Sequence, residues 1–415
     1  MILPLLAWII VGVSVLGVIV RPFGLPEYVW ATAGAVLVVL IGTVPLAAAA
    51  AAAGRGADVY EFLVGMMLLS EFGREQGLFD YLAHHAVRWS KGSRTRLFAI
   101  VYAVGTVVTI FMSNDATAVV LTPAVAAAAR AAKVPALPYL FVCAFIANAA
   151  SFVLPISNPA NLVVFADQMP PLPVWLMRFA LPSVLAIVAT FVSLRLAQAK
   201  ELSGTIEPVG EVEPLTPGGR LTAVGIAGTA LVLLVASSLG WQLGLPTLIA
   251  SAIVAALILV TSRQSPWPVL SHISWGVLPL VAGLFVLVEA LAQTGVLAAL
   301  GAALQASTAN SVTEAAAWAG VLTAFGSNIF NNLPVGLIAA AVNHAVHSPT
   351  PVTSALLVGV DLGPNLSVAG SLATILWLIA LRREGVSVSG LRFLMLGVVT
   401  MIPALVLALA VLLLL

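Results

Sequence analysis

Charged side chains are scarce in this sequence. Asp, Glu, Lys and Arg make up only 8% of its 415 residues, whereas hydrophobic residues make up 61%. A soluble domain carries about 25% charged residues, so the composition excludes an ordinary soluble protein. The net charge of +1 gives no support to nucleic-acid binding, which needs a basic face. We therefore expect an all-α polytopic protein that is embedded in a lipid bilayer and binds no nucleic acid.

Cysteine clusters and nucleotide motifs are also missing. Cys143 is the single cysteine, which excludes an intramolecular disulfide and a thiolate cluster for a soft metal. The phosphate-loop motif GxxxxGK[ST] does not occur, so we expect no ATP hydrolysis by this chain. We expect no cofactor, no metal site and no enzymatic activity. Residues 1–20 lack a basic start and a cleavage site, which favours a retained first helix over a signal peptide.

Long apolar runs fill most of the chain. A helix that spans a bilayer needs about 20 apolar residues. The predicted spans lie at about 3–20, 28–53, 59–73, 138–166, 175–195, 221–239, 246–261, 275–294, 351–381 and 393–414. A polar linker at 198–220 separates a first repeat, 1–197, from a second repeat, 221–415. Each repeat then holds five spans.

Two further apolar stretches, 97–131 and 311–346, carry a polar interruption in the middle. Their central residues are Ser113-Asn114-Asp115-Ala116-Thr117 and Ser327-Asn328-Ile329-Phe330-Asn331-Asn332. Each stretch is either a pair of full spans or a re-entrant hairpin. The arms of the first have about 16 residues, or about 24 Å of helix, and the hydrocarbon core is about 30 Å thick. This shortfall favours hairpins, whose irregular backbone is tolerated when it lines a cavity.

The basic residues predict the orientation. With this layout, 15 of the 17 Lys and Arg residues fall on one side, and only Arg55 and Arg178 fall on the other. Basic residues concentrate in cytoplasmic loops, so the linker faces the cytoplasm and both termini face out. An odd number of spans inverts the second repeat relative to the first. Inverted repeats with broken helices near the midplane are typical of secondary transporters.

Each repeat contains a second interruption downstream of its hairpin. The first runs from Leu154 to Asn161 and the second from Asp361 to Ser367. Proline breaks a helix, and a broken helix frees backbone groups that bind a polar solute. We expect two hairpin tips and two broken helices to enclose one polar site. The candidate substrate-binding residues are Ser113, Asn114, Thr117, Ser157, Asn158, Asn161, Ser327, Asn328, Asn331, Asn332, Gly363 and Asn365.

Asp115 and Asp361 are the carboxylates beside these interruptions. A charge inside hydrocarbon is costly, so each acid either carries a proton in the transport cycle or is a protonated partner of a neighbouring helix end. We expect proton coupling to depend mainly on Asp115, and both interpretations stay open for Asp361. Ordinary interhelical hydrogen bonds are the alternative for a single Asn or Ser; we favour them for Asn148 and Ser151, but not for the four clusters together.

Four stretches together carry a resemblance to a known family. They are Ser113-Asn114-Asp115 with Leu121-Thr122-Pro123, Ser157-Asn158 with Asn161, Ser327-Asn328 with Asn331-Asn332-Leu333-Pro334, and Asp361-Leu362-Gly363-Pro364 with Gly370-Ser371-Leu372-Ala373-Thr374. With them the chain resembles the bacterial arsenite efflux permeases of the ArsB type, in a superfamily that also holds NhaD-type sodium/proton antiporters and dicarboxylate carriers. Asn365 departs from the Lys that we expect there in many members, which removes a fixed cation from the second break.

The resemblance implies export of arsenite or antimonite, as the neutral trihydroxide, in exchange for protons. It also implies a bacterial cytoplasmic membrane, with periplasmic termini in the orientation above, and association with a soluble ArsA-type ATPase. A sodium/proton antiporter of the NhaD type is the alternative on the same scaffold. A dicarboxylate substrate would favour Arg, Lys or helix N-termini, and no Arg or Lys falls in the four clusters. A membrane anchor for an ATPase would not need paired polar interruptions.

Overall fold

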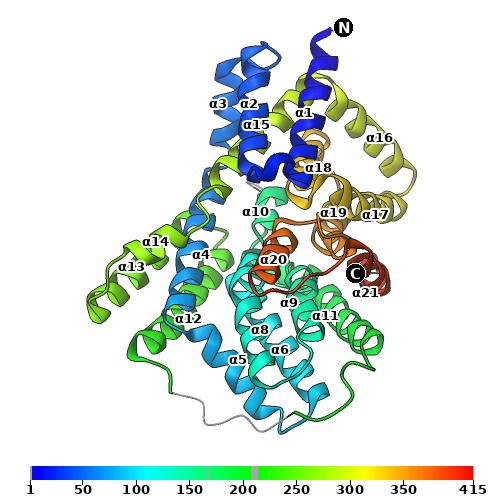
Figure 1. The fold of residues 1–415 in the computed structure, drawn as a ribbon. Coiled ribbons are helices and arrows are strands. Elements are labelled where there is room, and N and C mark those ends of the chain that lie inside the picture. The colour runs from blue at the N-terminus through cyan, green and yellow to red at the C-terminus, as the bar shows by residue number, and fades with distance from the viewer. Residues whose placement is uncertain (1, 166–167, 207–213, 415) are drawn as a thin grey trace.

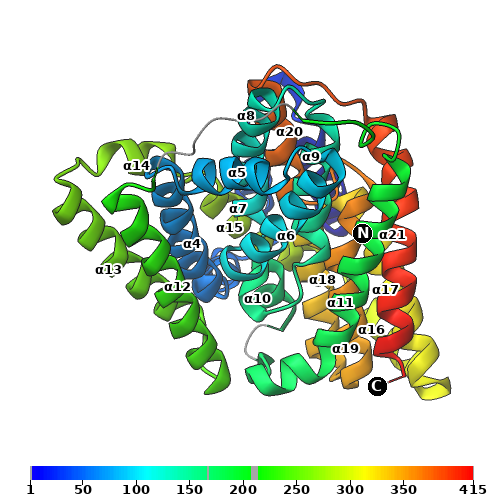
Figure 2. The ribbon, with the colours of Figure 1, turned by 90° about the horizontal axis from the view of Figure 1, so that it is seen from below.

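The protein is described here by a computed structural model covering residues 2–165, 168–206 and 214–414, and the chain within these ranges is almost entirely helical. Its β structure there is a single bridge between Ser93 and Thr205. Residue 166 of the predicted broken helix and residues 207–213 of the predicted linker lie outside the described ranges. Figure 1 shows the helices, and Figure 2 shows α11 alongside α21 and α14 beside α4, as their contacts also indicate.

The first half contains opening helices, an interrupted pair, a broken helix and a closing helix. The opening elements are α1 (Ile2–Val20), η1 (Pro22–Gly24), α2 (Glu27–Leu40), α3 (Leu46–Gly54), α4 (Ala57–Glu75) and α5 (Leu78–Trp89). The interrupted pair comprises α6 (Arg94–Met112), α7 (Asn114–Ala116), the π-helical turn η2 (Thr117–Leu121) and α8 (Thr122–Ala131). The broken helix comprises α9 (Leu137–Ala149), η3 (Pro155–Ser157) and α10 (Pro159–Phe165), and the closing helix is α11 (Leu172–Ala197).

The second half repeats this order. The opening helices are α12 (Pro217–Ser238), α13 (Gly244–Ser262), α14 (Trp267–His272), α15 (Val277–Gln293) and α16 (Val296–Asn310). The interrupted pair comprises α17 (Val312–Phe330) and α18 (Asn332–Val346). The broken helix comprises α19 (Thr350–Leu362), η5 (Gly363–Leu366) and α20 (Leu372–Arg383), and the closing helix is α21 (Gly390–Leu412).

The two interrupted pairs are built alike. Each first arm starts at a serine cap: the hydroxyl of Ser93 accepts from the amide of Arg96, and that of Ser311 accepts from the amide of Glu314. Such a side chain satisfies one of the free amides at a helix start. In the first half α5 packs against both α6 and α8, and in the second half α16 packs against both α17 and α18. One preceding helix therefore supports both arms in each half.

Two sequence predictions about the opening helices were wrong or incomplete. The single helix predicted at 28–53 is two helices, α2 and α3, that both pack against α15. Gly42 has φ of 79° and Pro45 precedes α3, so the chain stops and restarts there. Helix α16 was not predicted at all, because its small and polar residues do not form a long apolar run.

Seven helical segments in the described part of the chain are long and apolar enough to cross a membrane. They are Leu3–Val20, Arg94–Met112, Leu172–Ala197, Pro217–Ser238, Gly244–Ser262, Trp267–Gln293 and Gly390–Leu412. The first arm, α6, is among them: its 19 residues extend over about 28 Å, which is longer than the predicted arm. The fold is thus that of a multi-pass helical membrane protein.

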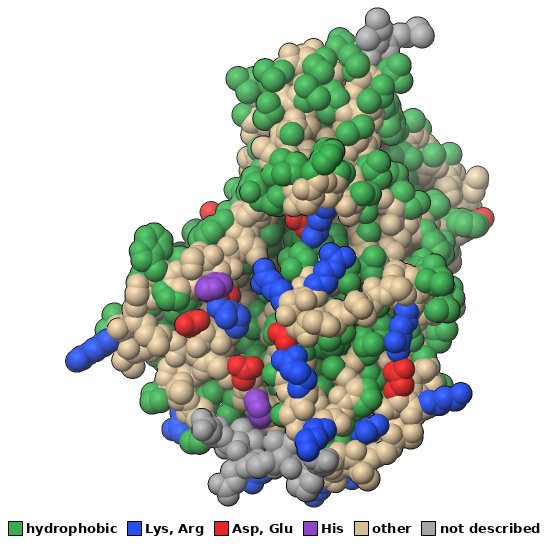
Figure 3. All heavy atoms as spheres, in the orientation of Figure 1, with side chains coloured by type: hydrophobic (Ala, Val, Ile, Leu, Met, Phe, Trp, Pro, Cys, Tyr) green, Lys and Arg blue, Asp and Glu red, His purple; other side chains and the backbone are tan. Residues whose placement is uncertain are grey.

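Polar and aromatic contacts join the two halves. The indole nitrogen of Trp377 on α20 donates to the carbonyl of Leu140 on α9 at 2.8 Å. The rings of Phe141, Phe145 and Phe393 surround this contact. On the face seen in Figure 3, Lys and Arg side chains gather where Figure 1 places α5, α8 and α20. Arg130, in the last turn of α8, pairs with Glu384 at 2.7 Å. A second ion pair joins α15 to the end of α3: Glu289 contacts Arg55 at 2.7 Å.

Candidate functional site

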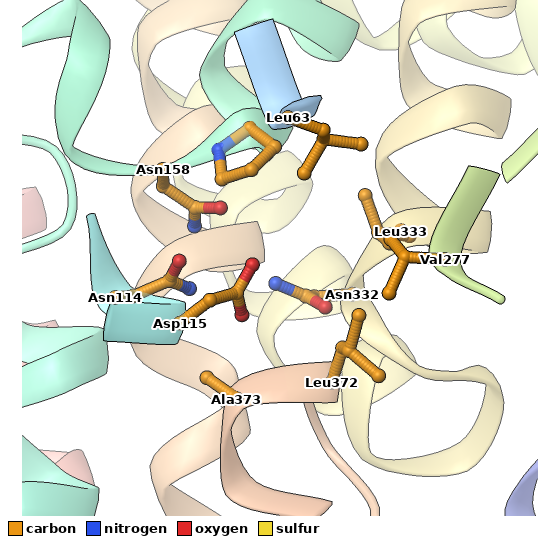
Figure 4. A pocket seen from close by; sticks show the side chains of 10 residues that line it. Leu63, Asn114, Asp115, Asn158, Val277, Asn332, Leu333, Leu372 and Ala373 are labelled. Carbon is orange, nitrogen blue, oxygen red and sulfur yellow. The ribbon is translucent and has the colours of Figure 1, made fainter. Parts of the chain in front are cut away.

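A small polar pocket lies where the interrupted pairs meet the broken helices. Four polar side chains line it (Figure 4): Asn114 and Asp115 of α7, Asn158 before α10, and Asn332 of α18. The apolar lining residues are Leu63, Pro159, Val277, Leu333, Leu372 and Ala373. We call this site the central pocket. Its cavity volume is about 10 Å³, which is close to the space that one water molecule needs.

Four helices begin at the central pocket. Asn114 opens α7, Pro159 opens α10, Asn332 opens α18 and Leu372 opens α20. Helix starts leave backbone amides free and carry partial positive charge. Three of these helices are long enough to carry an appreciable partial charge at their start: the continuous run α7–η2–α8, α18 and α20. The pocket is therefore suited to oxygen-rich solutes, and the acidic Asp115 lies in a first turn, where a negative charge is favoured.

The turns before α7 and α18 have the same unusual backbone. Ser113 has φ and ψ of 103° and 160°, and Asn331 has 71° and 151°. This region is almost restricted to glycine and costs about 1–3 kcal/mol for other residues. Asn331 is held by its side chain, which accepts from the amide of Leu333 at 3.3 Å and donates to the carbonyl of Ala369 at 3.1 Å. Each strained residue directly precedes a helix start that faces the pocket.

The two broken helices contact each other through side chains. The amide nitrogen of Asn158 donates to Oδ1 of Asp361 at 2.8 Å, and Oδ1 of Asn158 caps α10 through the amide of Ala160 at 3.0 Å. Asp361 is fully buried but does not line the central pocket. The sequence predicted a carboxylate beside each interruption, Asp115 and Asp361. Within the described residues, only Asp115 lines the central pocket.

Two amide oxygens in the central pocket are buried without a hydrogen-bond donor. Oδ1 of Asn114 and Oδ1 of Asn332 have no partner within the described ranges. A buried acceptor that lacks a donor costs free energy, so most such groups in proteins are satisfied. The same side chains also carry amide nitrogens, and Asn158 adds another amide, so the central pocket holds both acceptors and donors beside the Asp115 carboxylate. A ligand with several hydroxyl groups matches such a site.

Asn365 forms part of a buried network away from the pocket. Its Oδ1 accepts from Nδ2 of Asn148 at 3.0 Å, and its Nδ2 donates to the carbonyl of Phe145 at 3.0 Å. Asn148 also donates to Thr374 at 3.3 Å and accepts from Ser371 at 3.2 Å. The interhelical role expected for Asn148 is confirmed. Asn365 was expected to contact substrate, and here it joins α9 to η5.

Other candidate residues support the interruption in the first half. Nδ2 of Asn161 donates to the carbonyl of Ser151 at 2.9 Å, which satisfies backbone freed by the break. The hydroxyl of Ser157 donates to the carbonyl of Ile110 on α6 at 2.9 Å. The hydroxyl of Thr117 bonds that of Thr109 at 2.8 Å. These three side chains hold the backbone around the central pocket without lining it.

The second half has equivalent supports. Nδ2 of Asn328 donates to the carbonyl of Gly363 at 2.9 Å, and the hydroxyl of Ser327 donates to the backbone carbonyl of Thr323, one turn earlier in α17, at 2.8 Å. Gly363 itself lies against α17, where an added Cβ would come within 2.7 Å of the Ala324 carbonyl carbon. Close backbone contact of this kind needs small residues. Asn328 and Gly363 therefore fix α17 to the broken helix, whereas the Ser327 hydroxyl bonds within α17.

Sequence reasoning missed the apolar part of the pocket. Leu63 comes from α4 and Val277 from α15, and both belong to uninterrupted apolar runs that give no local signal. Leu372 and Ala373 had a signal. Ser371 caps α20 through the amide of Thr374 at 3.1 Å, and a Gly-Ser pair before an apolar run is typical of a helix start.

Apolar helices long enough to span a bilayer, broken helices and a buried polar pocket define a multi-pass membrane transporter. The chain belongs to the citrate transporter family CitMHS, whose profile matches residues 6–359. It is 27% identical to an arsenical pump membrane protein of Escherichia coli, over 98% of this chain and 97% of the relative. It is 25% identical to a putative arsenical pump membrane protein of Bacillus subtilis, over 89% of this chain and 90% of the relative.

The fold is also similar to that of a solved structure. The crystal structure of the YdaH transporter of Alcanivorax borkumensis matches with a TM-score of 0.59 and 16% identity. The match covers 93% of this chain and 97% of that chain. At this identity the likeness concerns the fold alone.

Proposed function

We propose that this protein exports arsenite or antimonite, as the neutral trihydroxide, from the cytoplasm in exchange for protons. Arsenical pump membrane proteins of two bacterial species align with almost the whole chain, which supports this substrate class. The asymmetry of Lys and Arg supports a bacterial cytoplasmic membrane, with the linker in the cytoplasm and both termini in the periplasm. A soluble ArsA-type ATPase that docks on the cytoplasmic side belongs to the same proposal.

The polar lining of the central pocket, which has one carboxylate and no Lys or Arg among the described residues, carries the proposal. Asn114 and Asn332 present amide oxygens without donors within the described residues, and Asp115 adds a carboxylate. A trihydroxide donates hydrogen bonds to such groups through its hydroxyls. A fully ionised tricarboxylate carries mainly acceptors and would meet the Asp115 carboxylate with like charge. The helix starts favour oxygen ligands in both cases, so the side chains decide between them.

Asp115 provides the coupling in this proposal. A neutral solute gains nothing from the membrane potential, so its uphill export needs a coupled ion. The ionised carboxylate accepts a hydrogen bond from substrate, whereas the protonated carboxyl has lost much of that acceptor strength. Proton and substrate then compete for one pocket, which is the condition for exchange. Asp361 is a second candidate, although its contact to Asn158 gives it a structural use as well.

Alternating access requires the central pocket to open. Its volume of about 10 Å³ is smaller than a trihydroxide, so the structure corresponds to a closed pocket. Leu63 of α4 and Val277 of α15 form the wall opposite the two interrupted pairs. We propose that the interrupted pairs and broken helices move as a unit against α4 and α15, which exposes the pocket to one side at a time.

Uptake of labelled arsenite into everted vesicles tests this function. With an acidic interior, wild-type vesicles should accumulate arsenite without sodium, and collapse of the pH gradient should stop accumulation. Citrate in excess should not compete. Sodium-dependent proton movement without arsenite flux would instead assign the NhaD-type antiporter, and competition by citrate would assign a tricarboxylate carrier. Addition of an ArsA-type ATPase with ATP tests the proposed partner, whose docking should increase uptake.

A further inference from the structure

A second cavity adjoins the central pocket and leads away from it toward α14. It shares Leu63, Asp115, Pro159 and Val277 with the central pocket, and its volume is about 60 Å³. By the same measure a water molecule needs about 10–15 Å³, so this side cavity is large enough for a short chain of water molecules. Its titratable lining residues are Asp115 at one end and Glu71 and His272 at the other.

One face of α4 connects the two cavities. Leu63, Met66, Met67, Ser70 and Glu71 recur at helical spacing and line the side cavity. From Leu63 to Glu71 the helix advances about 12 Å. Glu71 therefore lies about two turns from the central pocket, on the same face as the residue that forms its wall. It lies near the end of α4, just before α5, and α4 packs against α14 there.

Glu71 is a buried acid that the proposed exchange does not yet use. It is 7% exposed, and its Oε1 accepts from Nε of Arg74 at 2.9 Å. Nδ1 of His272, on α14, is 3.9 Å from the same oxygen. Both contacts use Oε1, and no hydrogen bond to Oε2 is found within the described ranges. Oε2 is thus the atom available for proton transfer in the side cavity.

The charges around Glu71 are few and come from three helices. Arg74 of α4 holds Glu71 and also contacts Glu75 at 3.4 Å. Asp80 of α5 adds a negative charge near Arg74. His272 is more than half exposed and lies on the outer side of Glu71. This arrangement keeps a carboxylate in a mostly apolar wall and leads from it to a solvent-accessible imidazole.

We propose that Glu71 is the proton-transfer residue between Asp115 and the cytoplasm, and that the side cavity is the path. In each cycle the proton leaves the carboxyl of Asp115, passes along water in the side cavity and binds Oε2 of Glu71. Asp115 becomes a carboxylate and Glu71 becomes neutral. Glu71 then loses the proton to cytoplasmic water beside His272. The proposal rests on the proton exchange above and adds the route that the proton takes.

Proteoliposomes allow the route to be separated from the exchange itself. Two readouts are needed: arsenite-driven pH change, which requires proton release, and exchange of labelled for unlabelled arsenite, which does not. Glu71→Gln should slow the coupled pH change by at least about tenfold, as expected for the loss of a positioned proton-transfer group, and leave arsenite exchange intact. Glu71→Asp should restore part of the coupled rate. Glu75→Gln is the matched control, because Glu75 also contacts Arg74 but does not line the side cavity.

Each result decides the proposal. An unchanged pH response in Glu71→Gln overturns it, and so does an equal loss of pH response and arsenite exchange, which would assign Glu71 a structural role. If Glu71→Gln fails to fold, Ser70→Leu fills the side cavity while keeping both carboxylates. It should lower the coupled rate alone, and an unchanged rate overturns the path. If the wild type exchanges arsenite without any pH change, the proton exchange fails and not the route alone.

Discussion

Asn158 of the first broken helix donates a hydrogen bond to Asp361 of the second at 2.8 Å. This contact joins the two halves directly beside the central pocket. Removing one partner of a buried hydrogen bond costs about 1–3 kcal/mol. We expect Asn158→Ala and Asp361→Ala each to lower thermal stability and transport. The double variant should be less unstable than the sum of the single effects, as measured by unfolding in detergent.

Asp361→Asn separates structure from chemistry at this contact. The amide of the variant keeps an oxygen that accepts from Asn158, so folding should persist. If Asp361 acts only as an acceptor, arsenite transport stays near the wild-type level. A folded variant with normal arsenite exchange but no proton movement would show that Asp361 carries protons, in contradiction to a purely structural role.

Asn148 should be important for stability and not for substrate contact. It bonds Asn365, Thr374 and Ser371, all buried, and links α9 to α20 and η5. Asn148→Ala leaves several partners unsatisfied, and we expect a loss of about 1–3 kcal/mol. Ser354→Ala is the control, because the buried hydroxyl of Ser354 has no hydrogen-bond partner in the described part of the chain. Equal stability of the two variants would contradict the network.

The backbone of Ser113 predicts an unusual tolerance. With φ of 103°, glycine fits this turn better than any other residue. Ser113→Gly should fold at least as well as wild type, while Ser113→Val should lose folded protein in the membrane. Arsenite uptake per folded molecule of Ser113→Gly then shows whether the Ser113 hydroxyl contributes to transport. Good folding of the valine variant would show that the turn does not need this conformation.

Gly363 is expected to tolerate no side chain. An alanine there would push its Cβ to 2.7 Å from the carbonyl carbon of Ala324, so α17 and η5 would have to separate. Gly228→Ala is the matched control, since nothing lies within 4 Å of its Cβ position and alanine favours a helix by about 0.5–1 kcal/mol. The midpoint temperature of thermal unfolding should fall for Gly363→Ala. It should stay the same or rise for Gly228→Ala.

The sequence alone was sufficient to predict the polar residues that interrupt long apolar runs. Asn114, Asp115, Asn158 and Asn332 interrupt apolar runs, so their polarity predicted the side chains that line the central pocket. Residues that follow the pattern gave no such signal. Leu63 is one more apolar residue in α4, and only packing places it opposite Asp115.

Hydrogen-bond assignments within the clusters were also beyond the sequence. Asn365 and Asn332 have the same side chain and similar surroundings in sequence. Asn365 bonds Asn148, whereas Asn332 lines the central pocket and its Oδ1 has no hydrogen-bond partner within the described ranges. Which Asn faces the pocket depends on how α18 and the broken helix are each rotated, and long-range contacts such as Trp377 with Leu140 set the packing of the broken helix.

Proton movement by Asp115→Asn tests the central claim most directly. The variant keeps the size of the side chain and a neutral oxygen that is a weaker acceptor than the carboxylate, and it cannot release a proton. In proteoliposomes with a pH-sensitive dye inside, the wild type should move protons against arsenite. Asp115→Asn should still exchange labelled arsenite for unlabelled arsenite, at a higher arsenite concentration than the wild type needs, and should give no pH change. A normal arsenite-driven pH change in Asp115→Asn would contradict the account.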